Sequence, residues 1–258
     1  MTPRRSAKAS IAPGDGGYLL SITLLRDKVP SFEEYPFSIP AVRSLKTLQF
    51  SPRVTFLIGE NGSGKSTLIE AIAILAGFNP EGGSKNLRFA ARPSESSLHG
   101  ALRLARGVRR EKAGFFLRAE TLFNLSTEVE DRGLFVYGWE DMHAKSHGEA
   151  FLWLVKERFR PKGLYILDEP EAALSPQRQL AMLALMDHLV AGGCQLIIAT
   201  HSPILMAYPG ATIYLLSDDR IKRVDYEATE HFQVMRGFLA DHHQYLRHLL
   251  GESPPPTC

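Results

Sequence analysis

The sequence has few cysteines and no long apolar run. Cys194 and Cys258 are its only two cysteines, so a framework of several disulfides is excluded. Such sparse cysteine usage is typical of a reducing compartment, and we expect a cytoplasmic protein. No stretch of about 18 or more apolar residues occurs, which predicts a chain without a membrane span. The residues before Tyr18 also lack the apolar stretch of a secretory signal.

An excess of charge of one sign is missing as well. Lysine and arginine number 30 against 28 aspartates and glutamates, which gives a net charge of +2 and a sequence pI near 8.5. This mild balance neither requires nor excludes nucleic acid as a partner. Hydrophobic residues make up 44% of the chain and charged residues 22%. That composition is typical of an ordinary globular protein.

The order of apolar segments predicts an α/β protein with a mainly parallel sheet, because buried strands alternate with helices. We expect strands at 17–25, 45–50, 54–59, within 114–124, and at 163–168, 194–200 and 211–217. We expect helices at 65–77, 97–106, 147–159, 175–192 and, as one helix or a pair, 230–251. Residues 1–16 and 252–258 are expected to be disordered tails. Residues 17–251 are expected to form a single domain with a helical, variable insert at about 80–160.

A glycine-rich loop lies between a predicted strand and a predicted helix. Residues 59–67, with the sequence GENGSGKST, satisfy the pattern G-x-x-x-x-G-K-[ST]. The glycines let several backbone N–H groups converge on phosphate oxygens at a helix N-terminus, where anions are favoured. Lys65 is expected to reach the phosphates, and the Ser66 hydroxyl to bind Mg²⁺. The candidate nucleotide-binding residues are Asn61, Gly62, Ser63, Gly64, Lys65, Ser66 and Thr67.

Two further segments place polar residues at the ends of apolar strands. Asp168 and Glu169 follow the strand in "LYILDEP", at the edge of a parallel sheet where ligands bind. Asp168 is expected to hold Mg²⁺, and Glu169 to act as the base that polarises a water for attack on the terminal phosphate. His201 ends the next apolar strand, "QLIIAT", and is expected to point at the same phosphate.

In their order and spacing, these segments resemble the ABC-type ATPase family. "GENGSGKST" is similar to its Walker A motif, "LYILDEP" to its Walker B motif with the catalytic glutamate, "AALSP" to its D-loop and "ATHSP" to its switch-histidine strand. The resemblance implies a P-loop NTPase fold of the ABC-ATPase type, with helices flanking the sheet and an antiparallel β part at the N-terminus. It also implies ATP as substrate, Mg²⁺ as cofactor and ATP hydrolysis as the activity.

The family's signature motif has a counterpart at residues 145–149, KSHGE, where Ser146 and Gly148 match the family's serine and second glycine. In the family this motif touches the terminal phosphate bound by a second subunit, which implies a homodimer on ATP binding. Glu120 stands where the family has its Q-loop glutamine and is a candidate metal ligand. The resemblance also implies an aromatic side chain that stacks on the adenine, and it does not distinguish among four candidates, namely Tyr18, Phe32, Tyr35 and Phe37.

The stretch between Ser66 and Ser146 is too short for a long coiled coil. The segments "SHGE", "FFLRAE" and "DEPEAALSP" with "THSP" look more like the stand-alone predicted AAA-family ATPases of bacteria, on the SMC/RecF-like branch. That resemblance implies a soluble ATPase in DNA repair or defence, with an unidentified protein partner. Two alternatives stay open, a nucleotide-binding subunit of an ABC transporter and a slowly hydrolysing ATP-gated clamp on DNA or protein. The arginine-rich stretch 103–110 motivates the second alternative.

Overall fold

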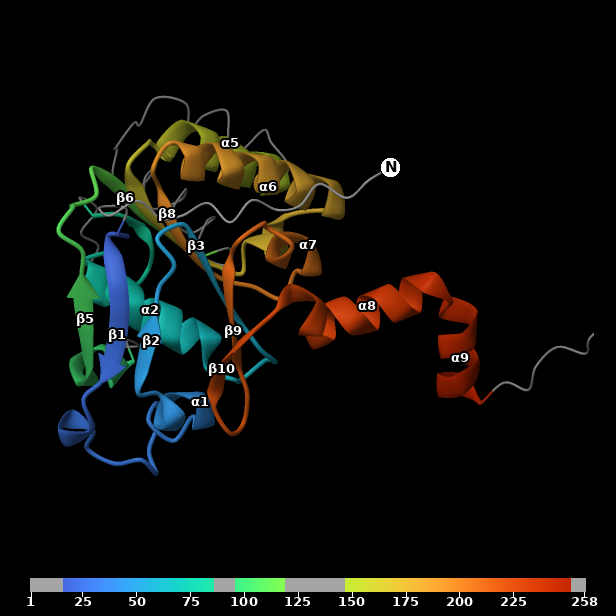
Figure 1. The fold of residues 1–258 in the computed structure, drawn as a ribbon, viewed down its shortest axis with the longest axis horizontal. Coiled ribbons are helices and arrows are strands. Elements are labelled where there is room, and N and C mark those ends of the chain that lie inside the picture. The colour runs from blue at the N-terminus through green and yellow to red at the C-terminus, as the bar shows by residue number, and fades with distance from the viewer. Residues whose placement is uncertain (1–15, 86–95, 119–146, 252–258) are drawn as a thin grey trace, which may run out of the picture.

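The computed structural model describes residues 16–85, 96–118 and 147–251. These residues form two β-sheets with helices packed around them (Figure 1). The strands are β1 Leu19–Leu24, β2 Thr47–Gln49, β3 Val54–Ile58, β4 Gly83–Ser84, β5 Leu102–Arg106, β6 Ala113–Arg118, β7 Gly163–Asp168, β8 Gln195–Ala199, β9 Thr212–Leu216 and β10 Ile221–Val224. The α-helices are α1 Pro40–Ser44, α2 Lys65–Ala76, α5 His147–Arg158, α6 Pro176–Ala191, α7 Pro203–Met206, α8 Glu230–Ala240 and α9 His242–Leu250.

The larger sheet is mainly parallel, as the sequence predicts. Its strand order is β10-β9-β3-β8-β7-β6-β4, and the five central strands run parallel while β10 and β4 pair antiparallel at the two edges. The smaller sheet, in the order β2-β1-β5, is antiparallel and contains the N-terminal strands. The predicted fold class, α/β with an N-terminal antiparallel part, is confirmed.

The central strands are buried on both faces, and each face has its own core. On one face, α2 lies between the two sheets, and Ile72 packs in the same cluster as Ile22 of β1 (Figure 1). On the other face, α5 and α6 cover the sheet, with Phe151 and Met186 in a second cluster. Strands enclosed in this way read as continuous apolar runs, which is why β3, β7 and β8 are recognisable in the sequence.

The prediction of a helix at 97–106 is wrong. A 3₁₀ helix spans Ser97–Ala101, and β5 begins directly after it. β5 pairs antiparallel with β1, with Ile22 opposite Leu104. This pairing with a strand far away in the chain overrides the local helical pattern. The edge strand β10 and the short helix α7 were not anticipated from the sequence.

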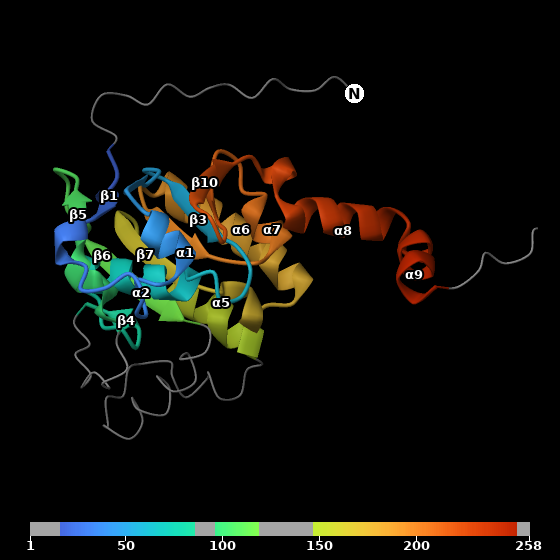
Figure 2. The same ribbon diagram turned by 90° about the horizontal axis from the view of Figure 1, so that it is seen from below.

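The last segment folds as a helix pair, one of the two forms expected for it. Helices α8 and α9 project from the rest of the structure in both views (Figures 1 and 2). We call this pair, residues 230–250, the C-terminal arm. Leu239 and Leu249 are each 71% exposed, so these apolar residues do not pack on the described part of the domain. Within the described ranges, no helix has both the length and the apolar character needed to span a membrane.

One buried side chain links the two sheets. The Gln195 amide, at the start of β8, accepts a hydrogen bond from the Leu19 N–H at 2.9 Å. It also donates to the carbonyls of Leu19 at 2.9 Å and Ser51 at 2.8 Å. Gln195 is fully buried, so no water replaces these partners. The position of β1 relative to β8 therefore depends on this amide.

We expect Gln195→Ala to lower the free energy of unfolding by about 3 kcal/mol, because it leaves three backbone groups without partners in the interior. Urea denaturation followed by circular dichroism measures the change. Gln177→Ala, at an exposed position of α6, is the matched control and should change stability by less than about 0.5 kcal/mol. An equal loss in both variants would show that the Gln195 amide has no special role.

Candidate functional site

Three neighbouring parallel strands bring the predicted motifs to one edge of the sheet. β8 lies between β3 and β7. Ala199 of β8 is in register with Leu57 of β3 and with Asp168 of β7. Because the three strands end at the same level, the segments that follow them meet. The glycine-rich loop, the carboxylate pair and His201 therefore lie at one edge, as the sequence predicts.

The glycine-rich loop adopts a conformation that depends on its glycines. Gly59, Gly62 and Gly64 have φ values of 150°, 81° and 92°. A Cβ atom at Gly59 would lie only 2.3 Å from the Leu216 carbonyl oxygen, and one at Gly64 only 2.8 Å from the Ile39 side chain. The backbone therefore curls tightly before α2 begins at residue 65. This is the form in which loop N–H groups and a helix N-terminus create an anion site.

Lys65 is buried under this loop. Its ammonium donates to the carbonyl oxygens of Gly59 at 3.0 Å and Glu60 at 2.8 Å. Burial lowers its pKa, and the carboxylates of Glu169, Asp168 and Glu171 act in the opposite direction. The Lys65 ammonium is thus held against the loop backbone, near enough to these three carboxylates for their charges to act on it.

The remaining loop residues differ in their exposure. Asn61 and Gly62 are exposed at the tip of the loop. Ser63 is partly buried, and within the described part of the chain its hydroxyl has no hydrogen-bond partner. The Thr67 hydroxyl lies 3.3 Å from that of Tyr35. Tyr35 is 67% exposed.

Among the four aromatic candidates for the adenine contact, Tyr35 is therefore the one with a free ring next to the loop. Tyr18 and Phe37 are buried in the core, and Phe32 packs against it.

Two of the three residues predicted to hold Mg²⁺, Ser66 and Asp168, are in contact. The Ser66 hydroxyl donates to one Asp168 oxygen at 3.3 Å. The other Asp168 oxygen lies 3.6 Å from Nε of Arg118, whose guanidinium also pairs with Glu70 at 3.0 Å. One hydroxyl and one carboxylate fit Mg²⁺, which takes few protein ligands and keeps waters and phosphate oxygens. Among the described residues, no group of three or more His, Cys, Asp or Glu side chains forms an all-protein metal site.

Glu169 and His201 face each other across the strand ends. Glu169 has left-handed backbone angles, φ 49° and ψ 52°, which a non-glycine residue adopts at a cost of about 1–3 kcal/mol. Its carboxylate is 3.4 Å from Nε2 of His201 and remains 37% exposed. Burial lowers the pKa of His201, and the nearby Lys65 cation lowers it further. An imidazole and an accessible carboxylate are thus placed side by side at this edge.

A second carboxylate, Glu171, holds the backbone that carries His201. It accepts hydrogen bonds from the Thr200 hydroxyl at 2.7 Å and from the His201 N–H. Burial raises the pKa of Glu171, and these two donors lower it. The segment after β7 is therefore tied directly to the segment after β8.

The start of α5 packs on the segment that follows Glu169. A Cβ atom at Gly148 would lie 2.8 Å from both the Ala173 carbonyl and the Arg178 side chain. Arg178 also pairs with Glu149 at 3.0 Å. A glycine is required at this position by the close approach of the Ala173 carbonyl. Ser146 and Glu120, the other signature residue and the Q-loop candidate, lie outside the described residues.

The structure adds four residues to the site that sequence reasoning missed, namely Glu70, Arg118, Glu171 and His231. Arg118 stands opposite Asp168 in the β6–β7 register. Glu171 lies two positions after Glu169, between the quoted runs "LYILDEP" and "AALSP". His231 comes from α8, and no motif in its part of the sequence indicates a contact with this site. Only Glu171 had a local signal, its place beside the carboxylate pair.

We expect Glu171→Ala to lower the free energy of unfolding by about 2 kcal/mol at pH 7, because the Thr200 hydroxyl and the His201 N–H lose their acceptor. Chemical denaturation measures the loss. Glu157→Ala, an exposed position on α5, is the control and should have little effect.

A comparison of wild type with Glu171→Gln tests how the contribution of Glu171 to the free energy of unfolding depends on pH. Burial raises the Glu171 pKa above its ordinary 4.5, so the native state holds this proton more tightly than the unfolded chain does. Wild-type stability relative to Glu171→Gln should therefore fall as pH rises from 4.5 to neutral. A difference that does not change over this range would contradict the assignment.

Two family models match separate parts of the chain. A model described as "AAA domain" matches residues 37–130, which include the glycine-rich loop. A model described as "AAA domain, putative AbiEii toxin, Type IV TA system" matches residues 150–207, which include Asp168, Glu169 and His201. No curated protein matches the sequence.

Solved structures are similar to this chain at low sequence identity. The SMC head domain from Thermotoga maritima is 19% identical over 80% of this chain and 99% of its own, with a TM-score of 0.44. The cbiO1 protein from Clostridium perfringens, part of the ABC transporter complex cbiONQ, is 18% identical over 92% of this chain and 100% of its own, with a TM-score of 0.47. The glycine-rich loop, the strand order around it and the two family matches support a P-loop ATPase fold with similarity to AAA domains.

Proposed function

We propose that the protein binds Mg-ATP at the glycine-rich loop, hydrolyses it and dimerises while ATP is bound. The observation that carries this proposal is the meeting of three strand ends, β3, β8 and β7, at one sheet edge. Each strand end delivers a group that phosphoryl transfer requires, namely a phosphate cradle, a metal-binding carboxylate with a base, and a histidine beside that base.

The phosphates and the adenine of ATP are bound by groups of different chemistry. The loop N–H groups of residues 61–67 and the Lys65 ammonium receive the phosphates, since both are electropositive. The exposed Tyr35 ring offers an aromatic surface for the adenine, because it lies next to Thr67 at the start of α2. Ser66 and Asp168 hold Mg²⁺, which when bound neutralises charge on the phosphate oxygens.

Hydrolysis rests on Glu169 and His201. The accessible Glu169 carboxylate accepts a proton from the attacking water, and His201 stands 3.4 Å from it and orients that water or the terminal phosphate. The strained backbone at Glu169 is held by its N–H, which donates to the Ala199 carbonyl of β8 at 3.0 Å. The base is thus fixed to the strand that carries His201.

We expect Glu169→Gln to lower kcat for ATP hydrolysis by about 100-fold or more while ATP still binds, since only the base is removed. Lys65→Ala should instead abolish nucleotide binding. Phosphate release and binding of a fluorescent ATP analogue separate the two effects, with Glu157→Gln as the control. Unchanged turnover in Glu169→Gln would rule out this base.

The dimer proposal rests on the start of α5. Gly148 is packed against the chain that follows Glu169, so the first turn of α5 and the hydrolytic segment form one unit. A helix start of this kind presents N–H groups that suit a phosphate of a second molecule. The resemblance of residues 145–149 to the ABC signature supports a head-to-tail arrangement of two copies.

Light scattering of Glu169→Gln should give a mass of 28.7 kDa without nucleotide and about twice that mass with Mg-ATP, because hydrolysis no longer reopens the dimer. The double variant with Lys65→Ala should remain monomeric under both conditions. A monomer with ATP demonstrably bound would favour a different protein as the partner.

The cellular role that fits this chemistry is a DNA-repair or defence ATPase. The description of the second family model, a toxin of a type IV toxin–antitoxin system, supports defence.

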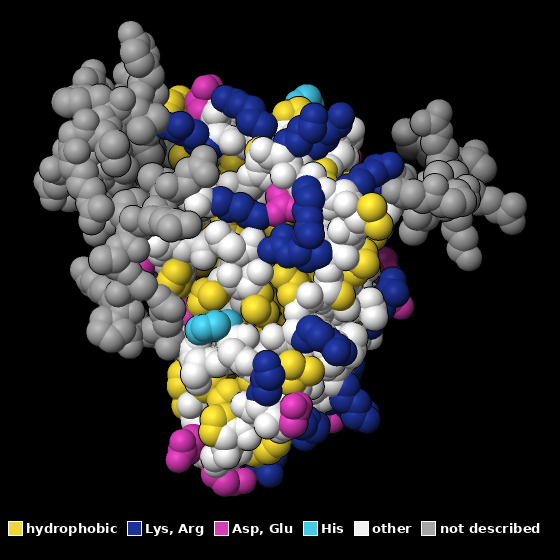
Figure 3. All heavy atoms as spheres, turned by 90° about the vertical axis from the view of Figure 1, so that its left-hand side faces the viewer, with side chains coloured by type: hydrophobic (Ala, Val, Ile, Leu, Met, Phe, Trp, Pro, Cys, Tyr) yellow, Lys and Arg dark blue, Asp and Glu magenta, His cyan; other side chains and the backbone are white. Residues whose placement is uncertain are grey.

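A specific observation also favours a clamp on nucleic acid. Lys and Arg side chains gather on the face that carries β5 (Figure 3). Arg103 and Arg110 are exposed there, whereas Lys85 and Arg106 pair with Glu111.

If this face binds DNA, Arg103→Ala with Arg110→Ala should weaken duplex binding and reduce the slope of log K against log salt by about 2, since two phosphate contacts are lost. Fluorescence anisotropy over a salt series, with ATP present, measures the slope. Lys222→Ala with Arg223→Ala, at exposed positions on the edge strand β10, is the control. A slope that stays unchanged would exclude this face.

A further inference from the structure

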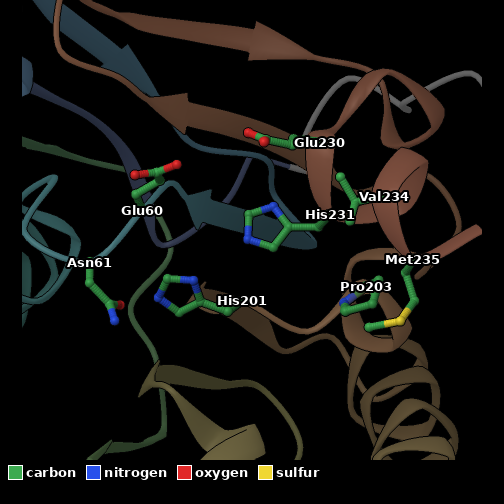
Figure 4. A pocket seen from close by; sticks show the side chains of 8 residues that line it. All are labelled: Glu60, Asn61, His201, Pro203, Glu230, His231, Val234 and Met235. Atoms are coloured by element: carbon green, nitrogen blue, oxygen red, sulfur yellow. The ribbon is translucent and has the colours of Figure 1, made fainter. Parts of the chain in front are cut away.

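A cavity of about 530 Å³ joins the nucleotide site to the C-terminal arm (Figure 4). Glu60, Asn61 and His201 line it from the side of the loop and strand ends. His231, Val234 and Met235 of α8 line it from the opposite side. Positions i, i+3 and i+4 share one face of a helix, so a single face of α8 is directed at the site.

The first turn of α8 is held firmly in this orientation. Thr229 is buried and caps the helix, and its hydroxyl accepts from the Phe232 N–H at 3.3 Å. The same hydroxyl donates to the Tyr226 carbonyl at 2.7 Å. The rings of Tyr226 and Phe232 pack at 4.8 Å between centroids. His231, between Thr229 and Phe232, is therefore positioned by its neighbours rather than free to swing.

His231 faces His201 across the cavity. The ring centroids are 5.7 Å apart, and the two imidazoles point into the same space (Figure 4). The Nδ1 atom of His231 is buried and has no hydrogen-bond partner among the described residues. A buried polar atom without a protein partner calls for a water or a ligand to complete it.

The electrostatics connect His231 to the phosphate loop. The pKa of His231 is lowered, mainly by burial and also by the Lys65 cation. The carboxylates of Glu230 and Glu60 act in the opposite direction. Two of these charges, Lys65 and Glu60, belong to the loop itself. A histidine ring has at least one N–H donor in either protonation state, so it suits a phosphate oxygen or a phosphate-bound water.

Beyond this first turn the arm has little else to hold it. None of the residues of α8 and α9 is buried, and both helices extend away from the sheets (Figure 2). The first turn of α8, which carries His231, is therefore the main attachment of the arm to the described part of the domain.

We infer that His231 is a second phosphate-facing histidine, which binds the terminal phosphate of ATP directly or through one water and so couples the C-terminal arm to the nucleotide state. This inference rests on the proposed function, since its ligand is ATP bound at the loop. It assigns His231 a positioning role that distinguishes ATP from ADP, and not the role of the base.

The test compares nucleotide binding and arm dynamics in the full chain. Calorimetry gives the Kd for Mg-AMP-PNP and for Mg-ADP in wild type, His231→Ala, His231→Gln and the control His243→Ala, which is exposed on α9. Hydrogen exchange of residues 230–250 is measured with each nucleotide. Circular dichroism verifies that each variant is folded, and the Gln variant keeps a hydrogen-bonding group if the Ala variant is unstable.

We expect His231→Ala to raise the Kd for Mg-AMP-PNP about tenfold and to leave the Kd for Mg-ADP within twofold, because only the terminal phosphate loses a contact. The wild-type arm should be more protected with AMP-PNP than with ADP, and this difference should disappear in His231→Ala, be partly retained in His231→Gln and be unchanged in His243→Ala.

Two contrary outcomes are distinguishable. If wild type binds both nucleotides and His231→Ala changes neither the ratio of the two Kd values nor the protection of the arm, the inference is wrong while the proposed function stands. If wild type binds neither nucleotide, or Lys65→Ala binds as wild type does, the proposed function is wrong and the inference falls with it.

Discussion

The site depends on the parallel register of β3, β8 and β7. Because Ala199 lies level with both Leu57 and Asp168, three segments that are distant in the chain leave the sheet at the same height. Each segment alone is a short polar turn. Together they form an electropositive loop beside a carboxylate pair and a histidine. The apolar side chains that bury these strands on both faces thus determine the chemistry at their ends.

Buried polar contacts then fix the relative positions of the pieces to within hydrogen-bonding distance. Gln195 joins β1 and the segment before β3 to the start of β8, and Glu171 joins the segment after β7 to the one after β8. Such contacts contribute little net free energy when complete but cost much when one partner is removed. They therefore specify one arrangement of the strand ends more than they add to overall stability.

The edge of the sheet is also bounded by two helix starts of different kinds. α5 begins against the segment that follows Glu169, and the first turn of α8 carries His231, which faces His201. Both helices therefore meet the site at their first turns, where a change of ligand acts most directly on the helix. The first is the proposed route to a second subunit, and the second is the proposed route to the C-terminal arm. Under these two proposals, a single chemical event at the phosphate would reach two surfaces.

The sequence by itself determined the parts of the site that are local in the chain. Gly59 to Thr67 requires its own backbone conformation, and Asp168, Glu169 and His201 each end an apolar run long enough to be read as a buried strand. The tertiary structure alone decided the contacts between distant segments. Residues 97–106 became a 3₁₀ turn and a strand because β1 lay beside them. Of the four candidate aromatics, Tyr35 kept an exposed ring beside the loop, because Tyr18 and Phe37 lie in the core and Phe32 packs against it. Arg118 and His231 reached the site through a strand register and a helix orientation. Neither leaves a periodic trace in the sequence, since each is fixed by packing against residues far along the chain.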